Sequence, residues 1–536
     1  MTRKISVLIV GGGPVGLALA GELGWRGIAC ELVEQTDGAI ASPKMNEVNI
    51  RSMEFCRRWG IAEKVFNCPF PADWPLDVAF VTSLSGHELS RLPRPGRSGQ
   101  APGPESPHRM QACSQIWFDP ILREFAGSFA HVRLRHRCRL DAFEQSNAGV
   151  TVRLTDLASG RQEVVEAEYL VGCDGAGSIV RRTLGIEHVG QGTIGHPINL
   201  FFRAPDLVER CGKRPATFFL GIDQTGLWGS LRIIDPVNGL WRLMVDSTDG
   251  NATVDNVDRE FYLRRALGRH FDVEWVDVNI WRRRSALAER YGRGRVWLAG
   301  DAVHQLSPTG GMGMNTGLAD AVDLGWKLAA TLEGWGGAGL IDSYDSERRP
   351  VGERAVRMAT FFYKNSENFP KGGAWLNEDG EEASRLRSEV GEQLQRAIGP
   401  EFRTVGLQIG YRYEESPICV ADGTPSPPDD PATYTPSARP GSRAPHVVLR
   451  DGRSTLDLYG RGFALLRFSG ASGEAIAQAA QARGVPLTAV ALDETEAAAL
   501  YGRKLVLVRP DGHVAWRADM PPANALSLID RVRGAG

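Results

Sequence analysis

The stretch "KISVLIVGGGPVGLALAGELGWRGIACELVEQ", residues 4–35, decides the fold. Its apolar run at 5–10 predicts a buried strand, the glycines that follow predict a turn, and residues 15–26 have the composition of a packed helix. A second apolar run at 29–33 ends in Glu34. The order strand, glycine turn, helix and strand is that of a βαβ unit in a parallel sheet.

Three glycines of the turn fill the pattern G-x-G-x-x-G. Gly11 makes the turn, Gly13 lets a diphosphate approach the backbone, and Gly16 lets the helix pack on the strand. Glu34 can accept hydrogen bonds from a ribose, which favours FAD or NAD over NADP. A plain structural turn is the alternative, but the strand, the helix and the acid together favour dinucleotide binding.

The bulk composition limits the other classes. A chain of 536 residues is too long for one ordinary core, so we expect two or three domains. Its 42% hydrophobic and 24% charged residues and its net charge of −2 indicate no nucleic-acid or membrane partner. The eight cysteines are scattered without a C-x-x-C pair, which predicts a reduced, cytoplasmic chain without a structural metal.

A second glycine loop lies far downstream, in "RVWLAGDAVHQLSPTGGMGMNTGLADAVDLGWKLA", residues 295–329. Asp301 at a strand end can accept hydrogen bonds from polyol hydroxyls, and the backbone at Gly310 and Gly311 can approach a flat ring. A helix over about 314–331 would place its positive end beside a ring that gains negative charge on reduction. These features predict that the loop binds the ribityl and flavin half of FAD.

At this point the sequence resembles a known family. The motifs "GGGPVG" at 11–16, "CDGAGSIVRRTLG" at 173–185, the loop from 294, and "YDSERRP" at 344–350 are similar to those of the class A flavoprotein aromatic hydroxylases, the group of para-hydroxybenzoate and phenol hydroxylases. The bacterial branch with a C-terminal thioredoxin-like domain is the most similar. The motifs span almost the whole FAD-binding scaffold.

The resemblance implies an α/β fold in several parts. A Rossmann-like FAD-binding domain of glutathione-reductase type would comprise residues 1–74, 108–187 and 284–388, and an antiparallel sheet formed by 75–107 and 188–283 would bind substrate. Residues 389–445, which include a stretch rich in proline, aspartate and serine, would form a connector. Residues 446–536 would form a thioredoxin-like domain, and they contain no cysteine for dithiol chemistry.

The resemblance also implies a set of FAD contacts. Asp301 would hold the ribityl chain, Pro308 would lie next to the flavin ring, and Arg51 and Gln115 match residues near the flavin. Asp174, with Arg181, belongs to a motif near the flavin and diphosphate that is linked to NAD(P)H use. The ADP part would contact Gly11, Gly13, Pro14, Val15, Gly16, Glu34 and Gln35, and the pyrimidine edge of the flavin would contact Gly311, Met312, Gly313, Met314 and Asn315.

Some of these residues have simpler structural interpretations. Asp174 is suited to cap the turn after its strand, a role compatible with a functional one. His304 is better explained as a packing or loop residue than as a base, and Asp320 and Asp323 as structural residues. Glu347, Arg348 and Arg349 are most simply an ion-pair group at a helix end. Where the family often has arginine, this chain has Gln35 and Lys44.

The segment between the second and third motifs is rich in short β runs and aromatic residues. The resemblance implies that this sheet covers the flavin and binds the substrate. Most of its aromatic residues must be ordinary core, because a strand packs one face. The named candidates for substrate contact are Trp228, Arg232, Trp241 and Arg242.

The implied activity is that of a single-component monooxygenase. FAD would be reduced by NADH or NADPH, which binds transiently, and would react with O₂ to form a C4a-hydroperoxide that hydroxylates a phenolic or polyketide-like aromatic substrate. Because the flavin carries the chemistry, no catalytic side chain is assigned. Baeyer–Villiger or other oxidative tailoring of a polycyclic aromatic is one alternative, and a flavin-binding protein that sequesters a ligand with little turnover is another. The expected partners are a small aromatic substrate and O₂. The sequence does not decide whether the protein forms a homodimer.

Overall fold

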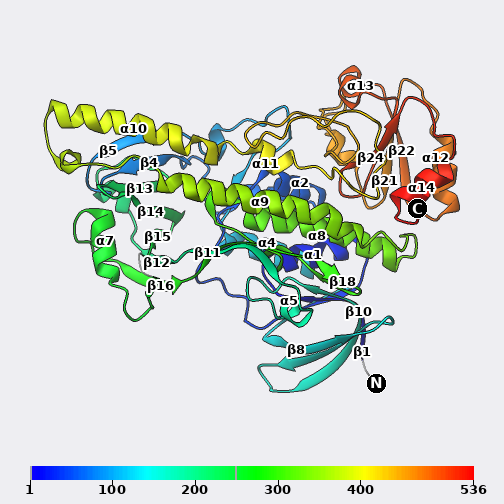
Figure 1. Cartoon of the computed structure of the whole chain (residues 1–536), viewed down its shortest axis with the longest axis horizontal. Coiled ribbons are helices and arrows are strands. Elements are labelled where there is room, and N and C mark those ends of the chain that lie inside the picture. The colour runs from blue at the N-terminus through cyan, green and yellow to red at the C-terminus, as the bar shows by residue number, and fades with distance from the viewer. Residues whose placement is uncertain (1–2, 248–249) are drawn as a thin grey trace.

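The computed structural model describes residues 3–247 and 250–536. Two long helices, α8 (Gly313–Leu332) and α9 (Ser343–Glu367), run through the middle of the molecule. Figure 1 shows a sheet-rich part and helix α10 at one end of them and the C-terminal part at the other. Among the described helices, none has both the length and the apolar character needed to cross a membrane.

The central sheet contains the predicted βαβ unit, which is confirmed. Strands β1 and β2 pair in parallel, and α1 (Pro14–Arg26) connects them. The strand order is β18 (Gly292–Arg293), β19 (Val296–Leu298), β10 (Gln162–Gly172), β1 (Arg3–Val10), β2 (Cys30–Glu34) and β7 (Val132–His136), with β9 (Val150–Asp156) and β8 (Cys138–Gln145) paired beside β10. β19 joins β10 in parallel, so the strand before the second glycine loop ends at the same edge as the first.

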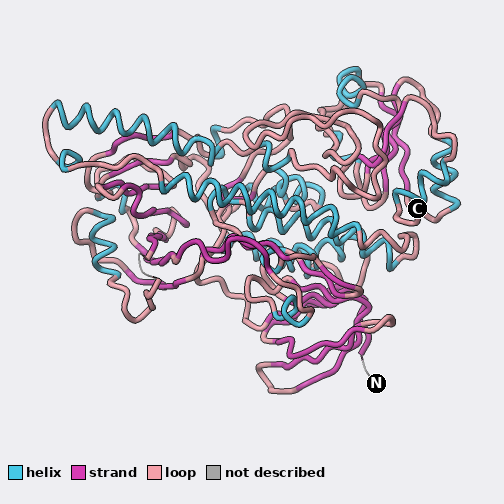
Figure 2. The backbone as a smooth tube through the Cα atoms, in the orientation of Figure 1, coloured by secondary structure: helices cyan, strands magenta, loops and turns pink. Residues whose placement is uncertain are grey.

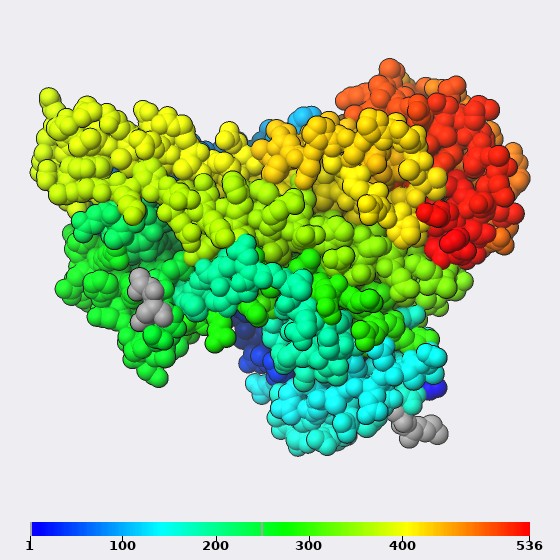
Figure 3. Space-filling view, viewed as in Figure 1, coloured from blue at the N-terminus to red at the C-terminus, as the bar shows by residue number. Residues whose placement is uncertain are grey.

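Helices cover this sheet because its strands are apolar on both faces. Val7, Leu8 and Ile9 are fully buried, as expected for a central parallel strand. α1 packs between α8 and α4 (Gln115–Gly127), and the shorter α2 (Ile50–Arg58), α3 (Ala62–Phe66) and α5 (Ile179–Thr183) lie around the same core. Figure 3 shows that later segments cover most of the dark blue N-terminal chain on this face.

The second large sheet was expected to be antiparallel, and this prediction is wrong at one pair. β13 and β4 run in parallel, because β4 belongs to the early excursion at 75–107 and joins the sheet from outside. The other pairs are antiparallel, in the order β16 (Glu274–Ile280), β12 (Pro197–Arg203), β15 (Leu240–Asp246), β14 (Gly226–Asp235), β13 (Phe218–Asp223), β4 (Val78–Val81) and β5 (Glu88–Leu92). α7 (Arg259–Leu267) packs on one face through a core that contains Trp241 and Phe219.

Two small sheets connect the two large sheets. β11 (His188–Gly195), β17 (Arg283–Ala288) and β20 (His304–Gln305) form one small sheet, and β3 (Glu47–Val48) and β6 (Gln111–Ala112) form another. They place Arg283 and Glu47 between the central sheet and the second large sheet.

The expected connector at 389–445 begins inside a helix. α10 (Glu381–Phe402) continues past residue 389 and packs on β5, where Ser90 donates to the carbonyl of Gly391 at 2.8 Å. The short α11 (Val405–Ile409) follows, and residues 410–445 have no longer regular element, as the tube in Figure 2 shows. The glutamates and glutamines of α10 favour a helix, whereas the proline-rich composition that suggested a connector starts only near residue 422.

The C-terminal part has a four-stranded sheet with three helices. Its sheet is β22 (Leu487–Leu492), β21 (Phe463–Phe468), β23 (Leu505–Val508) and β24 (Val514–Ala518), with α12 (Glu474–Ala482), α13 (Thr495–Tyr501) and α14 (Ala525–Val532). One of its two cores is shared with α8 and the residues that follow it. Trp326 and Trp335 pack against Phe463, Leu465 and other buried residues of this sheet.

Candidate active site

The turn between β1 and α1 is shaped by its glycines. Gly11 has a left-handed φ of +109°, and a Cβ there would overlap the carbonyl oxygen of Cys173. A Cβ on Gly16 would overlap the carbonyl oxygen of Gly11, so helix and strand are in contact at this point. A Cβ on Gly13 would meet no protein atom within 4 Å. The geometry has the tight turn, the close packing and the accessible backbone that a diphosphate requires.

The N-terminus of α1 is free to bind an anion. Gly13 is its N-cap, and no side chain caps the first turn, so the dipole and the first N–H groups are not satisfied by a side chain. Glu34 accepts hydrogen bonds from the backbone N–H groups of Gly12 and Thr36, both at 2.7 Å. These bonds hold its carboxylate beside the glycine turn. The neighbouring Gln35 is exposed.

Asp301 lies where the second glycine loop begins. It follows β19 in the turn Gly300–Ala302, and a Cβ on Gly300 would lie 3.0 Å from Val15 of α1, so the two motifs are adjacent. The Asp301 side chain is exposed, and no hydrogen bond to it is made by the described residues. A carboxylate without protein partners beside a diphosphate-binding turn is suited to accept hydroxyl hydrogen bonds from a ribityl chain.

The loop that follows exposes its backbone. Gly310 and Gly311 have φ of +79° and +64°, which larger residues rarely adopt, and the nearest atom to a Cβ on Gly311 is Glu47 Oε2 at 3.8 Å. Pro308 is exposed, and α8 begins at Gly313 without a side-chain cap. The first turns of α8 and α1 are adjacent, since a Cβ on Gly317 would overlap Val15, so the free N–H groups of both helix starts lie in the same part of the molecule.

Asn315 holds the loop to the rest of the protein. Its Nδ2 donates to the carbonyls of Gly311 at 2.8 Å and Glu47 at 3.2 Å. Its Oδ1 accepts from the Asn49 backbone at 2.9 Å and the Ser52 hydroxyl at 2.7 Å. The side chain of Asn315 is thus committed to protein contacts. Of its near neighbours, Met312 is buried, and Gly313 and Met314 are partly buried.

Arg51 and Gln115 are also held by protein groups. Arg51 is buried on α2 and donates to Glu54 and to the carbonyl of Asp511, both at 2.8 Å. Gln115 accepts from the Lys44 backbone at 2.9 Å and donates to Asp119 at 3.0 Å. Their contact with the flavin stays a prediction.

Asp174 caps the turn at the end of β10. Its Oδ2 accepts from the N–H of Val180 at 3.1 Å, while its Oδ1 is buried without a protein partner. Arg181 donates to the carbonyl of Ile186, and its Nε has no partner. The capping role is therefore present, and a free carboxylate oxygen stands beside the glycine turn.

His304 and Asp320 are buried behind the second loop. His304 Nε2 lies 2.8 Å from Asp320, which also accepts from the Gly300 N–H at 3.2 Å and from Arg348 at 2.9 Å. Burial would raise the pKa of Asp320, but Arg348 and His304 outweigh it and hold that pKa below its ordinary value. Asp320 thus holds both Gly300 and His304, two residues of the segment that leads into the second glycine loop.

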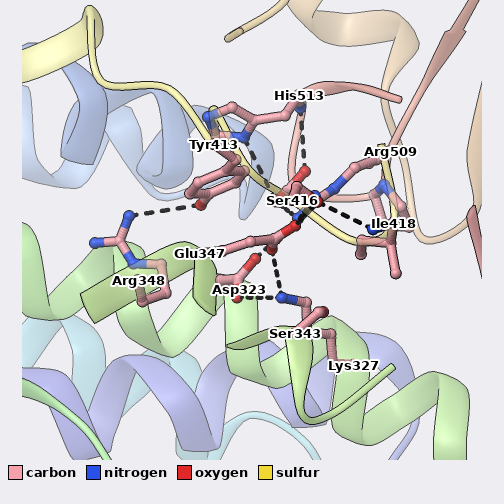
Figure 4. Close-up of polar contacts among 12 residues, drawn as sticks. Asp323, Lys327, Ser343, Glu347, Arg348, Tyr413, Ser416, Ile418, Arg509 and His513 are labelled. Atoms are coloured by element: carbon pink, nitrogen blue, oxygen red, sulfur yellow. Dashed lines mark hydrogen bonds and ion pairs between the residues drawn. The ribbon is translucent and has the colours of Figure 1, made fainter. Parts of the chain in front are cut away.

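A larger buried network links α8 and α9 to the C-terminal part (Figure 4). Lys327 contacts Asp323 at 2.7 Å and Glu347 at 2.5 Å. Arg509, from the C-terminal sheet, contacts Asp323 at 3.0 Å, Glu347 at 2.5 Å and Asp511 at 2.6 Å. All five side chains are at most 2% exposed. Glu347 and Arg348 lie in the first two turns of α9, near a helix end as expected, but they are buried because the C-terminal part covers these turns.

The four candidates for substrate contact lie on opposite faces of the second sheet. Trp241 packs in the core under α7, donating its indole N–H to the Ala204 carbonyl at 3.1 Å, and Trp228 packs against the same core. Arg232 and Arg242 are paired across β14 and β15, and Arg232 extends to Glu47 at 3.0 Å. Consecutive residues of a strand point to opposite faces, so Arg242 lies on the side opposite Trp241. Both tryptophans pack against the core of this sheet, and contact of any of the four residues with substrate stays a prediction.

Three acidic or basic residues near the second glycine loop were not predicted from the sequence. They are Glu47, Arg283 and Glu401, from β3, β17 and α10. Glu401 accepts from the Gly310 N–H at 3.3 Å. None of the three lies in a recognisable sequence motif. They are identified only because the fold brings them close to the same loop.

One cavity lies behind the loop and is lined by Arg51, Met312, Asn315, Arg348, Tyr411 and neighbouring residues. Its volume of about 20 Å³ suffices for one or two water molecules, so it cannot hold an aromatic substrate. Among the described residues, no group of three or more His, Cys, Asp or Glu side chains is arranged to hold a metal ion.

Comparison with known families agrees with this geometry. Residues 4–359 match the model of an FAD binding domain, and residues 437–534 match that of the C-terminal region of aromatic-ring hydroxylases. A FAD-dependent monooxygenase of Emericella nidulans is 34% identical over 96% of this chain and 87% of its own length. Aklavinone 12-hydroxylase of Streptomyces purpurascens is 32% identical, covering 99% of this chain and 98% of its own.

Solved structures are similar over the whole length. The rebeccamycin biosynthetic enzyme RebC with reduced flavin has a TM-score of 0.92 and 42% identity, with 100% of both chains covered. Aklavinone-11 hydroxylase with FAD and aklavinone has a TM-score of 0.83 and 31% identity, with 99% of both chains covered. The uncapped helix starts, the free Asp301 and the accessible glycine backbone fit the FAD that such proteins bind. The chain therefore belongs to the FAD-dependent aromatic-ring hydroxylases and is a flavoprotein monooxygenase.

Proposed function

We propose that this monooxygenase hydroxylates a flat aromatic substrate that carries an acidic group, and that Arg242 binds this group. The single observation that carries the proposal is the state of Arg242. Its side chain is buried and its Nε has no partner, and among the described residues no acid is paired with it. A buried guanidinium without a counter-charge is costly, so the site is built for an anion that arrives from outside.

The neighbours of Arg242 strengthen this argument. Burial, with the positive charges of Arg232 and Arg283, lowers the pKa of Arg242 to about 9. Arg232 already has Glu47 as a partner, and Arg283 lies 3.5 Å from Asp246, so these two cations are compensated. Arg242 is the cation of this group that an acidic substrate would neutralise. A carboxylate would satisfy its planar fork through two hydrogen bonds.

Aromatic rings and cations alternate beside these arginines. Arg232 lies over the ring of Phe218 at 4.3 Å, and Phe218 meets Phe402 edge to face at 6.1 Å. Arg94 lies over Phe402 at 4.5 Å. Such a surface favours a flat, electron-rich ring system. Relatives that include a polyketide hydroxylase of Streptomyces halstedii support an aromatic or polyketide substrate, and one RebC structure contains bound 7-carboxy-K252c.

The cofactor would be held by the two glycine loops. The turn Gly11–Gly16 with Glu34 would bind the ADP part, Asp301 the ribityl chain, and the backbone of 311–315 the pyrimidine edge of the flavin. When bound and reduced by NADH or NADPH, FAD supplies the activation of O₂ for transfer of one oxygen atom. The protein's own task is to orient the substrate ring over the loop and to keep bulk water away from it.

The C-terminal part is proposed to have a thioredoxin-like fold. Its sheet order β22-β21-β23-β24 has a parallel first pair joined through α12, then two antiparallel pairs, and a closing helix. Without cysteines in residues 446–536, its role would be structural. The shared core around Trp326 and the contacts of Arg509 support that role.

The proposal is tested by measuring NADH and NADPH oxidation, with hydrogen peroxide quantified in parallel, for matched pairs of an aromatic acid and its methyl ester. Coupled turnover with a mass gain of one oxygen identifies hydroxylation. We expect the acid to be preferred, and Arg242→Met to lower kcat/KM for the acid by about 10- to 100-fold, the value of a charge-assisted hydrogen bond, with little change for the ester. Arg203→Met, on the same sheet but away from the loop, is the control. Equal losses for acid and ester would refute the assignment of Arg242.

A further inference from the structure

The C-terminal end of α10 reaches the flavin loop through a carboxylate. Glu401 Oε1 accepts a hydrogen bond from the Gly310 N–H at 3.3 Å. Gly310 has the left-handed φ of +79° that opens the loop backbone. Oε2 has no protein partner among the described residues, and the side chain is only partly buried. One oxygen is therefore fixed by the loop and the other is available.

The surroundings of this carboxyl group come from several elements. Glu47 of β3 faces it across the loop, Arg94 follows β5, Arg283 belongs to β17, and Gly310 is in the loop itself. Removal from water raises the pKa of Glu401 to about 7. Glu47 adds to this effect, while the Gly310 hydrogen bond, Arg94 and Arg283 oppose it. At neutral pH the group can both take up and release a proton.

Glu47 is less suited to such a role. Its carboxylate is already engaged by Arg232 at 3.0 Å, so its charge is neutralised by a protein cation. Asp119 and Asp323 also have pKa values raised to about 7, but Asp119 is buried against Gln115 on α4 and Asp323 is enclosed by Lys327 and Arg509. Glu401 is the acid of this kind that combines contact with the loop and an available oxygen.

We propose that Glu401 is the proton acceptor of the substrate site, taking the proton of a hydroxyl group on the aromatic ring that is oxygenated. The proposal rests on the proposed function. The substrate O–H bond breaks, its proton passes to Glu401 Oε2, and the electron pair stays on the substrate oxygen. Delocalised into the ring, this pair makes the ring carbon a better nucleophile, and the proton then leaves to water from the partly exposed carboxyl group.

The test compares Glu401→Gln with Glu392→Gln, a substitution at an exposed site on the same helix. Glutamine keeps an oxygen for the Gly310 N–H but cannot accept the proton. For a hydroxyl-bearing substrate, the wild type should show kcat/KM rising with pH through about 7, and Glu401→Gln should lose this limb and about 10²- to 10⁴-fold in rate. Flavin content and Glu392→Gln should stay at wild-type values.

A second substrate separates proton transfer from a structural effect. The methyl ether of the same compound has no proton to give, so Glu401→Gln and wild type should process it at equal rates. Retention of the pH limb in Glu401→Gln, or an equal loss for the hydroxyl compound and its ether, would overturn the proposal. If the wild type showed no preference for acids over esters while the Glu401 results held, only the acidic-substrate assignment would fail.

Discussion

Replacing Arg509 by methionine should destabilise the protein strongly, because this side chain compensates carboxylates of both parts of the molecule. The network contains the carboxylates of Asp323, Glu347 and Asp511 and the cations Lys327 and Arg509. The wild-type network has three carboxylates and two cations, and the variant has three carboxylates and one cation. Methionine fills much of the volume of the arginine side chain, so the loss of stability comes mainly from the lost charge.

The magnitude follows from burial. Glu347 and Arg509 are fully buried, and removing one partner from a buried ion pair costs about 3–5 kcal/mol, because the other charge is left without compensation. That is a large fraction of the roughly 5–15 kcal/mol by which a protein is stable. Arg483→Met is the control, since Arg483 is 40% exposed in its pair with Asp530 and such pairs contribute about 0–1 kcal/mol.

The loss should depend on pH in a defined direction. Burial raises the pKa of Asp323 to about 7, so the folded state binds this proton more tightly than the unfolded state does, and stability falls as pH rises toward 7. Burial opposes ionisation of Glu347, but Arg509 and Lys327 hold its pKa down at about 2. Without Arg509 that pKa rises as well, so the variant should lose more stability at pH 8 than at pH 6.

Urea unfolding of the FAD-loaded protein, followed by tryptophan fluorescence at both pH values, measures these differences. Trp326 lies over Arg509 and in the shared core, so the signal reports on this interface. The double variant Asp323→Asn with Arg509→Met should recover part of the loss. Destabilisation by Arg509→Met no greater than that of Arg483→Met, or independent of pH, would refute the reasoning.

Three further predictions concern the cofactor site and helix α4. Gly13→Ala should leave the fold intact and weaken FAD binding, since its Cβ meets no protein atom, whereas Gly16→Ala should lower the unfolding midpoint because its Cβ overlaps the Gly11 carbonyl. Flavin titration measures the first effect and thermal unfolding the second. Equal behaviour of the two variants in both assays would contradict the different roles assigned to these glycines. Asp301→Ala should purify without flavin yet unfold within about 0.5 kcal/mol of the wild-type apoprotein, because its side chain is exposed; normal flavin absorbance would exclude the ribityl role. Burial raises the pKa of Asp119 to about 7, so the folded protein holds a proton that the unfolded chain releases near pH 4. The free energy of unfolding therefore falls as pH rises from about 4 to about 7. The total loss is at most about 4 kcal/mol for a shift of about 3 pKa units. Asp119→Asn should flatten that dependence in urea unfolding at pH 5 and pH 8, and an unchanged slope would show that Asp119 does not cause it.

The sequence by itself determined the parts of the site that depend on local spacing. Gly11, Gly13 and Gly16 can be interpreted without a structure, because a strand, a turn and a helix within about 30 residues leave a periodic signal and a backbone requirement that only glycine meets. The second loop is similar, since its glycines and the helix after it are consecutive. Asp301 could be predicted because it ends a strand just before that loop.

Only the tertiary structure decided which residues meet across long separations. Arg509 contacts Glu347 and Asp323 through a fold that brings distant segments together, and no local pattern distinguishes it from a surface arginine. Glu401 reaches Gly310 because α10 ends beside the loop, although its sequence resembles that of any solvated helix. The faces of Trp241 and Arg242 depend on strand register, which shifts every side chain to the opposite face when it changes by one residue. Burial, charge pairing and register arise from contacts between segments, so they are properties of the folded chain and not of any short stretch of it.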